Sequence, residues 1–67
     1  MKVILYYQRI GFDQTATSKS THATLRGALV YATGAYFAGL ILPDIITDQN
    51  GAILLTREAL YQAMRPS

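Results

Sequence analysis

A segment of sixteen residues without a charged side chain, GALVYATGAYFAGLIL from Gly27 to Leu42, dominates this chain of 67 residues. A helix on the surface of a soluble domain normally presents a polar stripe to water, and this segment has little besides Thr33 to offer. We therefore predict a helix that is covered on more than one side. Its own sheet is expected to cover one side and a second copy of the chain the other.

The same segment could instead be a helix that spans a membrane. At about 1.5 Å per residue, sixteen helical residues span roughly 24 Å, which is short of the ~30 Å hydrocarbon core of a bilayer. Extension toward the N-terminus brings in Arg26. A buried helix is therefore favoured, and a short single-span membrane protein stays as an alternative.

A chain of this length forms one domain, residues 1–67. Domains this small bury only about 60% of the surface that the unfolded chain exposes, and disulfides, metals or oligomerisation often add stability. Cysteine is absent, and the single His22 has no second imidazole partner, so neither disulfides nor a typical zinc site is available. Oligomerisation or unusually good packing of the 51% apolar residues is left.

The N-terminus, MKVILYYQR, has too short an apolar run for a signal peptide. The absence of cysteine is typical of a reducing compartment, so we predict a cytoplasmic protein. Six Lys and Arg against four Asp and Glu give a formal charge of +2, a mild bias that permits a polyanionic partner without indicating one.

The pattern predicts a first strand over residues 2–10, with Val3, Leu5 and Tyr7 on one face and Ile4 and Tyr6 on the other. Because both sets are apolar, both faces are expected to be covered. Residues 13–21 are polar and without pattern, which indicates a loop or, alternatively, an edge strand that returns from a turn near Gly11.

The long helix is expected to begin at His22 or Ala23, with Ser20 or Thr21 as N-cap. Gly39 is a candidate C-terminal cap, and Pro43 forbids continuation. Helical spacing predicts a core stripe of Leu25, Leu29, Ala32 and Tyr36, a neighbouring line of Val30, Thr33 and Phe37, and a third surface with Ala23, Gly27, Tyr31, Gly34 and Ala38.

Asn50-Gly51 between two β-rich runs predicts a hairpin with a type I′ turn. This turn would pair Thr47 with Leu54 and would direct Ile46, Ile53 and Leu55 toward the helix. A closing helix over 57–65 is expected to be capped by Thr56, to carry Glu58 in its first turn and to dock through Leu60 and Met64.

The expected fold is therefore α+β with the order β-α-β-β-α. A small three-stranded mixed sheet would pack against one long apolar helix and one short C-terminal helix. The strand after the long helix would run parallel to the first strand.

Polar chemistry is sparse. His22 lies in a hydroxyl-rich stretch, but a Ser–His nucleophile would lack an orienting acid and a G-x-S-x-G turn, so capping residues are the favoured interpretation. Anion binding at the helix start, with Lys19 and Arg26 nearby, is an alternative. The four carboxylates form no recognisable pair, and we predict no catalytic, cofactor-binding or metal residue and no small-molecule substrate.

The five tyrosines are expected either to lie in a protein–protein interface or to close a small core with their hydroxyls at its rim. Tyr6, Tyr7, Arg9 and Lys19 could instead form a platform for single-stranded nucleic acid, a second hypothesis that the small basic excess does not favour.

We predict a non-enzymatic protein–protein interaction module that forms a homodimer and binds a further protein partner. In its general character the chain is similar to small phage and mobile-element proteins that bind and modulate or inhibit a host protein, although no motif carries the likeness. The candidate interface residues are Tyr6, Tyr7, Gly27, Tyr31, Gly34, Phe37, Ala38, Ile45 and Leu54.

Overall fold

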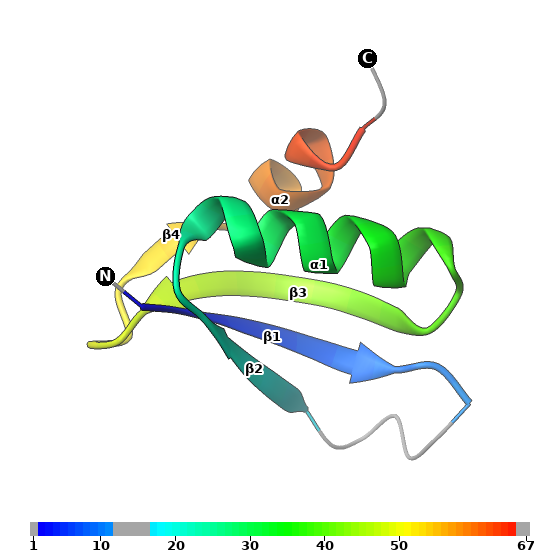
Figure 1. Cartoon of the computed structure of the whole chain (residues 1–67), viewed down its shortest axis with the longest axis horizontal. Coiled ribbons are helices and arrows are strands. Elements are labelled where there is room, and N and C mark those ends of the chain that lie inside the picture. The colour runs from blue at the N-terminus through cyan, green and yellow to red at the C-terminus, as the bar shows by residue number, and fades with distance from the viewer. Residues whose placement is uncertain (1, 12–16, 66–67) are drawn as a thin grey trace.

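The computed structural model describes residues 2–11 and 17–65, which form four strands and two helices (Figure 1). In chain order these are β1 (Val3–Arg9), β2 (Ser18–His22), α1 (Leu25–Phe37), β3 (Ile41–Asp48), β4 (Ile53–Leu55) and α2 (Arg57–Ala63). The strands form one sheet in the order β2-β1-β3-β4, in which every neighbouring pair is antiparallel. Both helices lie on the same face of this sheet (Figure 1).

The expected three-stranded mixed sheet is wrong. Residues 18–22 of the polar stretch form β2, an edge strand, as the alternative interpretation of this stretch proposed; residues 13–16 lie outside the described residues. Because β2 reverses the chain before α1, the strand after the helix runs antiparallel to β1. A polar edge strand lacks the apolar alternation that identifies a strand, and exposed edges often have this composition.

The two faces of β1 carry the residues expected of them. Leu5 is paired with Ile46 of β3 on the helix side, whereas Tyr6 is paired with Ile45 on the opposite side. A register shift between Tyr6 and Tyr7 places Tyr7 opposite Pro43. Within the described residues no element covers the side of Tyr6, which we call the open face of the sheet (Figure 1).

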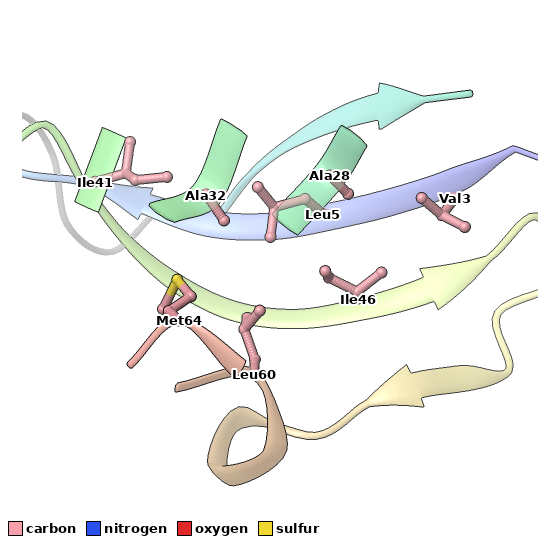
Figure 2. Packing of buried hydrophobic residues seen from close by; sticks show 8 residues of the cluster. All are labelled: Val3, Leu5, Ala28, Ala32, Ile41, Ile46, Leu60 and Met64. Carbon is pink, nitrogen blue, oxygen red and sulfur yellow. The ribbon is translucent and has the colours of Figure 1, made fainter. Parts of the chain in front are cut away.

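The core is a single layer between the sheet and the helices (Figure 2). Eight apolar residues are buried there: Val3, Leu5, Ala28, Ala32, Ile41, Ile46, Leu60 and Met64. The short helix α2 and its C-cap contribute Leu60 and Met64, as the spacing predicted. The long helix α1 contributes two alanines.

The N-terminal end of α1 differs from expectation, and the C-terminal end does not. Thr24 is the N-cap, and its hydroxyl accepts a hydrogen bond from the amide of Gly27 at 3.0 Å, so the helix begins at Leu25 and not at residue 22 or 23. At the other end the helix stops after Phe37, and Gly39 adopts a positive φ of 77° beyond the C-cap Ala38, as the sequence indicated.

The β3–β4 hairpin forms with a different turn. Among the described residues only glycines have positive φ, so Asn50 cannot occupy a type I′ turn. Instead Asp48 organises a loop of three residues: its carboxylate accepts hydrogen bonds from the amides of Asn50 and Ala52, at 2.8 and 2.9 Å, and Gly51 follows with φ 90°. The register then pairs Thr47 with Ile53, which places Ile53 on the open face instead of against the helix.

The closing helix begins at Arg57 as predicted but ends at Ala63, two residues before the predicted end. Thr56 accepts a hydrogen bond from the amide of Ala59 at 3.3 Å, Glu58 lies in the first turn, and Leu60 and Met64 are buried. This helix also contacts β3 through Tyr61, whose hydroxyl donates a hydrogen bond to the carbonyl of Pro43 at 2.7 Å.

Candidate functional site

The side of α1 that points away from the sheet carries large apolar side chains. We define the outward face of α1 as Gly27, Val30, Tyr31, Gly34, Phe37 and Ala38, all exposed. At 100° per residue, Val30, Gly34 and Phe37 lie opposite Ala28 and Ala32, the two helical residues that are fully buried, and Arg26 lies on the same side. Gly27, Tyr31 and Ala38 lie toward one edge of the helix, and there Tyr31 contacts His22 and Tyr7. Val30 is 67% exposed and Phe37 is 61% exposed.

This arrangement inverts the usual amphipathic helix. A helix that packs on one side normally buries its large apolar residues and exposes polar ones. Here the fully buried positions are alanines, while valine and phenylalanine face water. Leu29, Ala35 and Tyr36 pack at the margin of the core, and Leu25 of the predicted core stripe is 37% exposed.

In the line of Val30, Thr33 and Phe37 that helical spacing placed next to the core stripe, Val30 and Phe37 face solvent and Thr33 is half-buried. Alanines fit a helix that approaches the sheet closely, and their burial rotates the larger residues outward. Helical spacing alone does not show that Ala28 and Ala32 are the residues of α1 that contact the sheet most closely.

The two helical glycines have different surroundings. A Cβ atom at Gly34 would meet nothing within 4 Å, so the chain's own sheet does not approach this glycine closely. A Cβ atom at Gly27 would lie 3.2 Å from the hydroxyl of Thr24, the capping atom. Gly34 is thus a shallow open position in the middle of the outward face.

Charge on α1 is restricted to one residue. Arg26 lies in the first turn, which contains no acidic side chain, and the last turn contains no basic side chain. A cation is disfavoured at the positive end of a helix dipole, and the negative C-terminal end has no compensating cation on its own helix.

The remaining interface candidates lie elsewhere. Tyr6 and Ile45 form a register pair on the open face, where both are half-buried. Tyr7 lies on the helix side, and Leu54 packs against the core. The open face also presents Ile53, which is 58% exposed and was not among the candidates.

A polar and aromatic cluster joins β2 to α1. Ser20 Oγ lies 2.8 Å from His22 Nε2, and the His22 ring stacks obliquely on Tyr31, with centroids 5.2 Å apart. Tyr7 contacts Tyr31 at 6.4 Å between ring centroids. Burial, then the electrostatic influence of Tyr31 and a hydrogen bond with it, raise the pKa of Tyr7, against a smaller lowering by Arg9.

Within residues 2–11 and 17–65, the Ser20–His22 contact is the one pairing of a hydroxyl with a histidine that nucleophilic chemistry could use. The favoured interpretation as helix-capping residues was wrong, since both belong to β2 and Thr24 caps the helix. A serine nucleophile also requires an acid that orients the histidine and donors for an oxyanion. In the described part of the chain Asp44 and Glu58 belong to the α2 side of the molecule, and no three potential ligands or acids gather as a metal site would require.

A small cavity of about 170 Å³ lies between β3 and α2, lined by Gln8, Leu42, Pro43, Asp44, Arg57 and Tyr61. Its charged groups are satisfied by each other: Arg57 donates to Asp44 through Nε at 2.9 Å and lies within 2.8 Å of it through a terminal nitrogen. Burial raises the pKa of Tyr61, with a further increase from Tyr36. These contacts tie α2 to the bulge of β3.

The residues of the nucleic-acid and anion hypotheses are separated. Lys19 is the register partner of Tyr6 on the open face, whereas Tyr7 lies on the helix face. Tyr6 and Tyr7 therefore do not form one platform, and Lys19 does not join Arg26 at the start of α1.

Comparison with protein-family models, with curated proteins and with solved structures finds no match for this chain. Among the residues that the structure describes, no helix combines the length and the hydropathy needed to cross a membrane. The outward face of α1 is the candidate functional site that remains.

Proposed function

We propose that this chain is a non-enzymatic protein–protein interaction module that forms a homodimer through the outward face of α1. The observation that carries the proposal is the inverted helix, which buries alanines and exposes Val30 and Phe37. Contiguous exposed apolar surface on a small soluble domain is typical of a binding site. The same face would bind a different protein that offers an apolar groove, in competition with the second copy.

The expected affinity is modest. Complete burial of a valine or phenylalanine side chain contributes about 1.5–3 kcal/mol, and a two-fold dimer would bury both residues of each copy. Association costs at least about 4 kcal/mol in lost freedom, and a helix of this length is only about 20 Å long, so the interface is small. We expect reversible self-association with a dissociation constant on the order of tens of micromolar.

Light scattering coupled to size-exclusion chromatography, from about 5 to 500 µM, tests the proposal directly. The mass of the wild-type chain should rise from monomer toward dimer across this range. Val30→Glu should remain monomeric, because it places charge in the middle of the outward face.

Ile53→Glu is the matched control, since Ile53 is exposed to a similar extent on the open face of the sheet. This variant should associate as the wild type does. A wild-type chain that remains monomeric at every concentration would refute the proposal. Equal loss of association in both variants would move the interface away from α1.

A further inference from the structure

We infer that the second copy packs its α1 antiparallel to the first, in one register whose two-fold axis lies level with Ala32. The inference rests on the proposed function and adds the direction and alignment of the pair.

The shape of the face is self-complementary about Ala32. Val30 lies two residues before this position and Gly34 two residues after it; Gly27 lies five before and Phe37 five after. An antiparallel pair with its axis at Ala32 therefore sets Val30 level with Gly34 of the partner subunit, and Phe37 level with Gly27 of the partner subunit. Each large side chain lies beside a glycine, and each contact occurs twice, as two-fold symmetry requires.

The available space agrees with this register. The position of a Cβ atom on Gly34 is open, with no atom of its own chain within 4 Å. Val30 and Phe37 are the most exposed large side chains of α1. Small positions beside large ones allow two helices to approach and interdigitate.

Neighbouring registers lose this fit. If the axis moves to the level of Gly34, Phe37 comes level with Tyr31 of the partner subunit. If it moves to the level of Val30, the two Val30 side chains meet each other, and Gly34 comes level with Arg26 of the partner subunit. After a shift of one helical turn in either direction, neither Val30 nor Phe37 lies level with a glycine of the partner subunit.

Charge also selects the antiparallel direction. Arg26 lies six residues before Ala32, and the C-cap Ala38 lies six after it, so each Arg26 is placed beside the C-terminal end of the partner helix. That end carries a partial negative charge and has no basic residue in its own last turn. In a parallel pair the two Arg26 side chains and both helix dipoles would instead lie side by side and repel.

Disulfide trapping tests the register, because the natural chain contains no cysteine. Oxidation of a mixture of Val30→Cys and Gly34→Cys should give a covalent heterodimer at least about five times more abundantly than either variant gives a homodimer, since a disulfide requires Cα atoms within about 7 Å. Phe37→Cys alone should not cross-link: the antiparallel register separates the two positions by ten residues, or roughly 15 Å along the helix.

Two charge-reversal variants test the role of Arg26. Arg26→Glu should weaken self-association by about threefold or more, because the partner helix end repels the new anion at both sites. Lys19→Glu, a reversal of the same size on the open face, should leave it unchanged. Circular dichroism should show both variants folded.

The outcomes separate the two claims. Efficient cross-linking of Phe37→Cys alone would overturn the register. A dimer that the mixture of Val30→Cys and Gly34→Cys fails to trap would do the same. In both cases the proposed function would stand. A wild-type chain that never dimerises overturns both.

Discussion

Ala28 and Ala32 explain why Val30 and Phe37 face water. Each is fully buried against the sheet, and the turn of the helix then directs Val30 and Phe37 to the opposite side. Gly34 lies among them in open space. Much of the buried side could be recognised in the sequence, because Ala32 of the predicted core stripe is fully buried and Leu29 and Tyr36 pack against the core. The burial of Ala28 and the exposure of Leu25 could not be recognised.

Substitutions of Gly34 separate folding from association. Gly34→Ala should raise the free energy of unfolding of the monomer by about 1 kcal/mol, because an interior glycine is a poor helix former and the added methyl group meets no atom of the chain. Gly34→Leu should fold equally well but lose self-association, since leucine fills the space level with Val30 of the partner subunit. Urea unfolding at 5 µM and light scattering at high concentration measure the two effects; a Gly34→Leu chain that unfolds or still dimerises would contradict the account.

Tyr61 should make the stability of the fold depend on pH in the alkaline range. Its hydroxyl donates to the Pro43 carbonyl, and burial raises its pKa above 10.0, so the unfolded chain loses this proton first. The stabilisation is complete below about pH 10 and is lost as the pH rises through the folded pKa. Tyr61→Phe should cost about 0.5–1.5 kcal/mol at pH 7, and the difference from wild type should shrink above pH 10. Urea unfolding of the wild type and Tyr61→Phe at pH 7 and above pH 10 measures this difference in stability, with Tyr6→Phe as the control. A difference that does not change with pH would contradict the expectation.

At the scale of the elements, strong local patterns were predictable and weak ones were not. The alternation of β1, the cap and anchors of α2 and the presence of a hairpin near Gly51 all follow from local sequence. The strand β2 is the main omission, because its serines, threonine and lysine carry no apolar period and its pairing with β1 is a long-range contact. That single omission changed the direction of β3 relative to β1. The hairpin register failed for a local reason, since the Asp48 carboxylate stabilises a longer loop than Asn50-Gly51 suggested.

Asp48 should therefore be the residue on which the hairpin loop depends. Asp48→Ala removes the acceptor for two backbone amides and should destabilise the chain by about 1–2 kcal/mol, whereas Asp48→Asn, which keeps the side-chain oxygen, should cost less. Thermal unfolding of the two variants measures the difference. Equal melting temperatures for Asp48→Ala and the wild type would show that the loop forms without this carboxylate.

At the scale of the whole molecule, two surfaces of different kinds flank one thin core. Eight buried apolar residues lie between the sheet and the helices. Beyond them lie the outward face of α1 and the open face of the sheet. The prediction of surplus apolar surface on both layers named Gly27, Tyr31, Gly34, Phe37 and Ala38, all of which are exposed, and missed Val30, the most exposed large side chain of α1. We place the dimer on α1 because that face is almost free of charge and is self-complementary.

The two-dimensional ¹H–¹⁵N NMR spectrum of the wild-type chain, recorded over a dilution series through the dissociation constant, tests this placement most directly. We expect the amide signals that move on dilution to belong to the outward face of α1, centred on Val30, Gly34 and Phe37. The signals of Ile4, Tyr6 and Ile53 on the open face should stay in place. Signals that do not move at any concentration, or movement confined to the open face of the sheet, would contradict it.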